Sequence, residues 1–176
     1  MTKLFHHSKS GTYLPYQSNE LKLISVGTRT KFKLVIYGVG FYTDKPELYG
    51  DVIDENSYEF NDNKMFLLKF YRGVGNEKIM NAFIDGLQQR INIDGLEDDI
   101  NQFKNIFSKV QSLNYKDGLK LSFTNNGTLS FYYQDVGVSN EICLGELTNE
   151  RLVRNIYNIY LDGSSVTPDM KERIIN

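Results

Sequence analysis

Residues 21–42 read LKLISVGTRTKFKLVIYGVGFY, and this stretch decides the fold class. Its first part, Leu21–Val26, is an apolar run that ends at a glycine. Its second part, Phe32–Tyr42, carries apolar side chains at odd and even positions alike. A run of this kind predicts a strand that is covered on both faces. Gly38 and Gly40 interrupt the run, which indicates a bulge or a close approach of backbone or ligand.

The rest of the chain predicts strands and helices in separate blocks. Apolar residues at three- and four-residue spacing are typical of amphipathic helices, and strict alternation with polar residues is typical of strands. Strands are expected at 57–60, 64–71, 119–123, 129–133 and 138–144; helices are expected at 79–91, at 96–110, after a cap at Thr148 and from Pro168. Because strands cluster at 21–71 and 117–144 with helices between and after them, the fold class is α+β.

A single domain accounts for the whole length. A chain of 176 residues buries roughly 70% of its unfolded surface, which is enough for one core. No internal repeat and no linker divides it. We expect a polar N-terminal tail at residues 1–13, with a short first strand as the alternative there, and the domain at residues 14–176.

Composition excludes several function classes. The net charge is −2 with both signs interspersed, so nucleic acid is not an expected partner. A single Cys143 rules out an internal disulfide and a cysteine-based metal cluster. The sequence carries neither a signal peptide nor a run of ~18 apolar residues, so no membrane span is expected. We expect a cytoplasmic monomer without metal or cofactor. The 12 Tyr and 11 Phe suit a sheet-rich fold or an apolar ligand cavity.

Arg29 is the residue with the clearest chemical interest. It could be an ordinary exposed arginine at a strand end, or an anion anchor, since a guanidinium stays charged and its donors fit a carboxylate. Tyr37 could add a neutral O–H donor. Eight residues of continuous strand would separate the two by ~26 Å. They meet only if the chain turns near Thr30–Lys31 or if the arginine reaches back along a neighbouring strand.

Other motif-like features carry less weight. Gly38-Val39-Gly40 and Gly73-Val74-Gly75 lack the third glycine of a dinucleotide fingerprint. A Ser-His-Asp triad would have to use His6 or His7, which lie in the expected tail and are better interpreted as surface residues.

Three blocks resemble the chalcone isomerase-like superfamily. SVGTRTKFKLVIYGVGFYTD (residues 25–44) resembles its glycine–arginine strand block, KFYRGVGNEKIMNAF (69–83) its strand and first long helix, and IYNIYLDGSSVTPDMKERII (156–175) its C-terminal helix and valine–proline segment. The blocks occur in the family's order along nearly the whole chain. The resemblance implies an open-faced β-sandwich, in which a layer of helices packs on a large antiparallel sheet.

The resemblance also sorts the residues of the family's cleft. Arg29 matches the family arginine, and Tyr37 replaces the threonine of the enzymes, as in the fatty-acid-binding members whose Arg and Tyr hold the carboxylate. By the same resemblance, the tyrosine on the enzymes' first helix matches a position around Gly75–Asn76. The asparagine on that helix matches a position near Ala82, one step from Asn81. The threonine or serine late in the enzymes' sequence matches Ile159. Most of the catalytic polar set is therefore replaced.

We expect a non-catalytic protein that binds a fatty acid or a flavonoid-like apolar acid between sheet and helices. The expected ligand-binding residues are Arg29, Tyr37, Ile79, Ala82, Phe83, Ile159 and Tyr160. One alternative is an isomerase of the intramolecular lyase type, with Arg29 as the catalytic residue, acting on a chalcone or an unknown substrate. A third is a partner-binding scaffold with an exposed apolar patch.

Overall fold

A computed structural model describes residues 1–135 and 141–175. Its centre is a seven-stranded sheet in the order β11-β10-β9-β6-β5-β4-β3, and every neighbouring pair is antiparallel. The strands are β3 (Gln17–Ser18), β4 (Leu21–Lys31), β5 (Leu34–Thr43), β6 (Lys64–Phe70), β9 (Gly118–Phe123), β10 (Leu129–Gln134) and β11 (Glu141–Leu147). The predicted α+β fold with a large antiparallel sheet is confirmed. Residues 138–140 of the strand expected at 138–144 lie outside the described residues.

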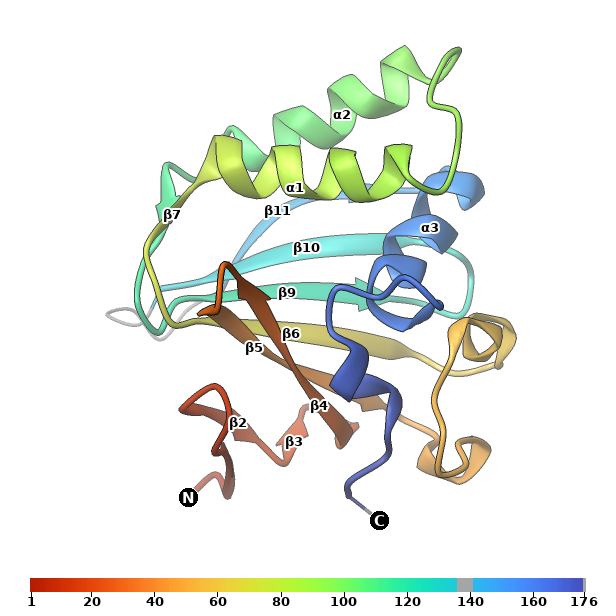
Figure 1. Cartoon of the computed structure of the whole chain (residues 1–176). Helices are drawn as coiled ribbons and strands as arrows, with labels where there is room; N and C mark the ends of the chain where they lie inside the picture. Colours follow the sequence, from red (N-terminus) through yellow and green to blue (C-terminus); the bar gives the residue numbers. More distant parts are fainter. Residues whose placement is uncertain (136–140, 176) are drawn as a thin grey trace.

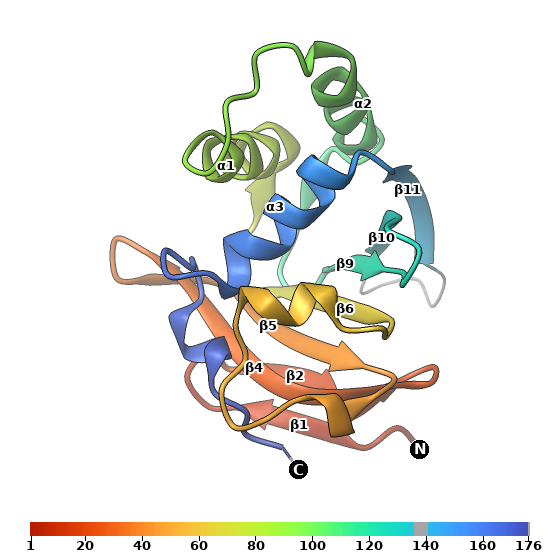
Figure 2. The same cartoon turned by 90° about the vertical axis from the view of Figure 1, so that its right-hand side faces the viewer.

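Three helices pack over one face of this sheet, and both termini lie on the side away from α1 and α2 (Figures 1 and 2). They are α1 (Asn76–Gln88), α2 (Glu97–Phe107) and α3 (Glu150–Leu161). The expected cap of α3 at Thr148 is wrong by one residue, because Asn149 accepts a hydrogen bond from the Leu152 N–H at 3.2 Å. None of the helices in the described ranges is long and apolar enough to cross a membrane.

Small elements complete the chain. The pair β1 (Leu4–His7) and β2 (Thr12–Pro15) forms a two-stranded sheet, as does the pair β7 (Val74–Gly75) and β8 (Ser112–Leu113). Three short 3₁₀ helices are η1 (Pro46–Leu48), η2 (Glu55–Glu59) and η3 (Pro168–Lys171). The strand predicted at 57–60 is therefore wrong: Asp54 caps η2 by accepting a hydrogen bond from the Asn56 N–H.

The N-terminal residues expected as a tail instead pack on the sheet. A Cβ at Gly38 would lie 2.2 Å from Oγ1 of Thr12 and 2.5 Å from Oγ of Ser10. A side chain at this position would overlap Ser10 and Thr12, so Gly38 does mark a close approach, but by side chains and not by backbone or ligand as predicted. A small second core lies on the same face of the sheet, opposite the helices, and consists of Leu14, Leu23, Val26, Tyr42, Met65 and Leu67.

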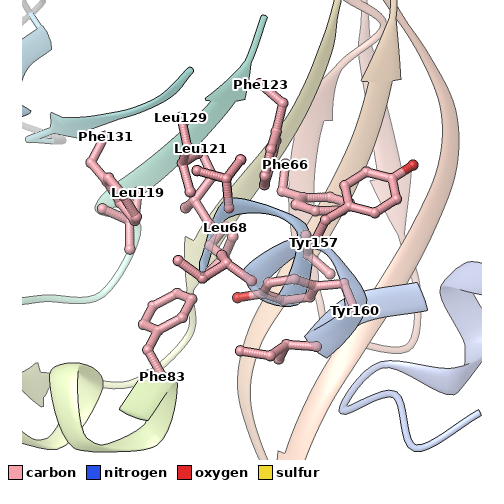
Figure 3. Packing of buried hydrophobic residues seen from close by; sticks show 14 of the residues in the cluster. Phe66, Leu68, Phe83, Leu119, Leu121, Phe123, Leu129, Phe131, Tyr157 and Tyr160 are labelled. Carbon is pink, nitrogen blue, oxygen red and sulfur yellow. The ribbon is translucent and has the colours of Figure 1, made fainter. Parts of the chain in front are cut away.

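The main core between sheet and helices is rich in aromatic rings (Figure 3). Phe83 of α1 contacts Phe103, Phe107 and Phe131, with ring centroids 5.7–6.4 Å apart. Tyr160 lies 4.7 Å from the ring of Phe66. Contacts of this kind contribute about 0.5–1.5 kcal/mol per pair beyond the burial of the rings. Packing between aromatic rings of the helices and of the sheet therefore holds the two layers together.

The turn between β4 and β5 differs from the sequence-based expectation. The stretch 32–42 was expected to be extended throughout, but Lys31 pairs with Leu34 and only Phe32 and Lys33 form the turn. Their φ angles are +51° and +63°. Two-residue hairpin turns require positive φ at both positions, and glycine or asparagine normally supplies it. The sequence carries no such signal here.

Candidate functional site

The turn at Phe32–Lys33 brings Arg29 directly opposite Tyr37. The two residues are partners in the antiparallel β4–β5 register. Directly opposed residues point their side chains to the same face of a sheet. Tyr37 packs against the main core and lies 5.3 Å from the ring of Phe70, so the arginine also points to the face that carries the helices.

Tyr160 of α3 is the third member of this group. Its hydroxyl lies 3.4 Å from the hydroxyl of Tyr37, and either group can be the donor. Figure 3 shows that the hydroxyl groups of Tyr160 and Tyr157 point in opposite directions. The hydroxyl of Tyr157 is hydrogen-bonded at 2.6 Å to that of Ser57. The Tyr157 ring packs on Phe41 of β5, but of these two tyrosines only Tyr160 places its hydroxyl beside that of Tyr37. The sequence placed it as an apolar lining residue, although a tyrosine on the buried face of a helix usually needs a hydroxyl partner.

Both hydroxyls stay protonated at neutral pH. Burial raises the pKa of Tyr37 and, together with the neighbouring Tyr37 hydroxyl, raises the pKa of Tyr160 well above its usual range. The positive charge of Arg29 acts in the opposite direction on both pKa values. The guanidinium therefore acts electrostatically on both phenols, and the phenols present neutral O–H donors. The hydrogen bond between Tyr37 and Tyr160 uses one of the two hydroxyl hydrogens and leaves the other free to donate.

Arg29 itself is only partly exposed. Among residues 1–135 and 141–175, its guanidinium has no side-chain hydrogen bond and no ion pair. By contrast, Arg90 and Arg173 are anchored to a carboxylate and to backbone carbonyls, respectively. We call Arg29, Tyr37 and Tyr160 the arginine–tyrosine cluster. It has several unused donors and a positive charge, which is the donor set that a carboxylate requires.

The space behind the cluster is filled by side chains. Ile79, Phe83, Ile159 and Tyr160 are each no more than 6% exposed. Ile159 packs on Gly86 of α1 so closely that a Cβ there would lie 2.8 Å from its Cδ1. Ala82 lies on the exposed side of α1 and does not join the others. The expected lining residues are thus brought together, Ala82 excepted, as a closed interior.

The positions that carry the enzymes' polar side chains do not gather around Arg29. Asn76 donates to the carbonyl of Phe107 at 3.2 Å, which ties it to the end of α2. Asn81 is exposed and Ile159 is apolar and buried. The replacement of the enzymes' polar set stays a prediction of the resemblance.

Two other features lie away from the cluster. A surface hollow of about 470 Å³ lies on the opposite face of the sheet; its lining includes Leu21, Met65, Lys120, Tyr132 and Glu141. Its lining is polar and apolar in about equal parts, and Lys120 within it is already paired with Glu141 at 3.0 Å. Within the described part of the chain, no group of three or more His, Cys, Asp or Glu side chains is placed to hold a metal ion.

Comparisons with known proteins agree with this arrangement. The chain matches the family model described as chalcone isomerase-like over residues 5–175. A comparison with curated proteins gave no significant match. Among solved structures, the chain is similar to the fatty-acid binding protein AtFAP1 of Arabidopsis thaliana, with a TM-score of 0.74 and 16% sequence identity over 96% of this chain and 94% of that one. The likeness in structure establishes the fold, and the match to the family model covers nearly every residue. The chain therefore belongs to the chalcone isomerase-like family.

Proposed function

We propose that this protein binds a fatty acid or a similar apolar carboxylate, with the carboxylate held by Arg29, Tyr37 and Tyr160. The observation that carries the proposal is a partly exposed arginine, Arg29, whose guanidinium lacks a partner among the described residues. It lies opposite the partly buried Tyr37, whose hydroxyl is beside that of the buried Tyr160. Because Arg29 is partly exposed, its unused donors can reach an anion from solvent. An anionic ligand supplies the missing partner.

The stereochemistry of the cluster suits a carboxylate. A guanidinium binds both carboxylate oxygens through two parallel hydrogen bonds. The O–H that the Tyr37–Tyr160 bond leaves over can donate to the same anion. The chemistry of the surroundings favours an apolar remainder, since Tyr160 belongs to the main core and Tyr37 packs against it; this core also includes Ile79, Phe83 and Ile159. The related fatty-acid binding protein from Arabidopsis supports the same ligand class by analogy.

The alkyl chain enters by separating α1 from α3. The interior has closed packing, so the ligand has to displace side chains such as Ile159, which lies against Gly86. Apolar surface of the chain replaces apolar surface of the core, and each buried CH₂ group contributes about 0.8 kcal/mol. A longer alkyl chain therefore gains more to set against the cost of repacking.

A titration of delipidated protein with lauric acid tests this proposal. The wild type should bind at micromolar concentrations, and Arg29→Gln should lose about 1.5–3 kcal/mol, because it removes a charge-assisted contact. Tyr37→Phe should lose about 0.5–1.5 kcal/mol, as expected for one neutral hydrogen bond. Arg151→Gln is the matched control, since Arg151 is exposed on α3.

Methyl laurate, which lacks the charge, should bind weakly to the wild type and equally weakly to Arg29→Gln. If the wild type binds no acid, or if Arg29→Gln binds lauric acid as well as the wild type does, the proposal is wrong. The alternative function, an isomerase, stays a separate prediction. Its test is whether the protein makes chalcone absorbance fall faster than it does spontaneously.

A further inference from the structure

The turn between β4 and β5 exposes apolar side chains at its end. Phe32 is 87% exposed and Leu34 is 48% exposed. Lys31 and Lys33 flank the phenylalanine, and the ammonium group of Lys31 lies 5.7 Å from its ring. Figure 2 shows this hairpin extending from the side of the molecule below α1. An aromatic ring at the end of a projecting arm, flanked by two cations, contributes little to the core.

The backbone of this turn is also unfavourable for the residues it contains. Both Phe32 and Lys33 adopt positive φ, which is uncommon for residues other than glycine and an outlier for a bulky one. Asn-Gly would form the same two-residue turn without this cost. The strain and the exposure together indicate that these side chains serve a contact outside the fold.

Further cationic and aromatic residues lie beside the hairpin. Tyr71 N–H donates to the Ile36 carbonyl, and Arg72 Nε donates to the Val35 carbonyl at 3.2 Å. Tyr115 lies edge-on to Tyr71 with ring centroids 5.8 Å apart. Cations cover these rings as well, at 5.9 Å for Arg72 over Tyr71 and 5.4 Å for Lys116 over Tyr115. We define the strand-end rim as Lys31, Phe32, Lys33, Leu34, Tyr71, Arg72, Tyr115 and Lys116.

We propose that the strand-end rim docks this protein on the surface of an anionic lipid bilayer. Phenylalanine and tyrosine favour the boundary between head groups and acyl chains, and lysine and arginine attract anionic head groups. Four cations lie on the rim, although the whole chain has a net charge of −2. The protein thus presents a basic, aromatic edge on an otherwise slightly acidic molecule.

The shape of the rim favours a bilayer over a nucleic acid. Single-stranded nucleic acids bind in basic grooves where bases stack on flat aromatic faces. Here Phe32 projects from a tip, while the Tyr71 and Tyr115 rings stand edge to face with each other under their own cations. A projecting ring with flanking lysines is suited to shallow insertion. Arg29 lies two residues before Lys31, so docking would bring the arginine–tyrosine cluster close to the lipid surface, but docking does not require acid binding.

Cosedimentation with vesicles tests the proposal. The probe is phosphatidylcholine vesicles with and without phosphatidylglycerol, and the variant is the double substitution Phe32→Asn/Lys33→Gly. This variant installs the favoured turn sequence, so its melting temperature should be equal to or above that of the wild type. Its binding to the anionic vesicles should be weaker by about 50-fold or more, because it removes one aromatic insertion and one cation.

Matched controls are Val52→Ala and Lys104→Gln, which remove an exposed apolar side chain and an exposed cation elsewhere. Both should bind anionic vesicles as the wild type does. The proposal is overturned if the wild type does not sediment with anionic vesicles, if neutral vesicles bind it equally well, or if the double variant binds within about 3-fold of the wild type. Tighter binding to oligouridylate than to vesicles would assign the rim to nucleic acid and also overturn it. Because the double variant keeps Arg29, lauric acid titration in solution reports separately on the cluster.

Discussion

Truncation of Ile159 to alanine separates the two roles that the interior plays. Ile159 is 4% exposed and fills the space against Gly86, where α1 and α3 meet. Its neighbour Tyr160 carries the hydroxyl of the arginine–tyrosine cluster. The substitution removes three carbons from the packed contact between α1 and α3 and leaves a cavity there. Stability should therefore fall while the space for an alkyl chain grows.

The magnitudes of these two effects are comparable. Truncating a buried isoleucine to alanine costs about 2–5 kcal/mol, and we expect about 3 kcal/mol here. For a domain of this size that lowers the melting temperature by about 6–12 °C. A ligand at 100 times its dissociation constant stabilises the folded state by about 2.7 kcal/mol. Saturating lauric acid should thus restore most of the stability that the substitution removes.

Differential scanning fluorimetry with and without lauric acid measures this rescue. The control is Ile106→Ala, because Ile106 is equally buried and also packs on a glycine, Gly145, but at the far edge of the sheet. Both variants should lose stability, and only Ile159→Ala should gain more from the acid than the wild type gains. Equal rescue of both variants, or none of Ile159→Ala, would refute the assignment of this space to the ligand.

Three further predictions concern the fold. Lys64→Met should cost about 3–5 kcal/mol in urea unfolding, because it leaves the buried carboxylate of Asp62 without its ion-pair partner; an unchanged midpoint would show that the pair contributes nothing. Gly38→Ala should cost about 1–3 kcal/mol and raise amide exchange in β1 and β2, since its Cβ would overlap Thr12; protection as in the wild type would contradict the close packing. Burial and Asp117 raise the pKa of Tyr133 to about 12, so the unfolded chain loses this proton first and stability should fall as the pH rises from about 10 to 12; a flat stability profile across that range would disprove it.

The local periodicities of the sequence were sufficient for most of the fold. Helix α1 and the β9–β10 hairpin follow from side-chain spacing and the Asn-Gly signal, which act over a few residues. Arg29 and Tyr37 could be named from the sequence for their chemistry, but not placed together. Their meeting depends on a turn built from Phe32 and Lys33, which no turn rule would select.

The rest of the candidate site depends on contacts between distant parts of the chain. Tyr160 lies 123 residues from Tyr37, and which of the α3 tyrosines places its hydroxyl beside Tyr37 is set by how the helix rotates on the sheet. The closed interior depends on how individual rings such as Phe83 pack, which composition does not specify. The β1–β2 pair was missed because its short strands carry no clear alternation.

Under the proposed function, the closed interior would also limit how fast an acid can enter. A protein whose binding-competent form is a minor state takes up its ligand only as often as the core between α1 and α3 opens. At high acid concentration the observed association rate should then level off at the opening rate instead of rising in proportion. The apparent affinity is reduced by the fraction of open molecules. Release of a bound acid would require the same opening and would also be slow. A bound acid would therefore stay on the protein through many collisions with other molecules that could accept it.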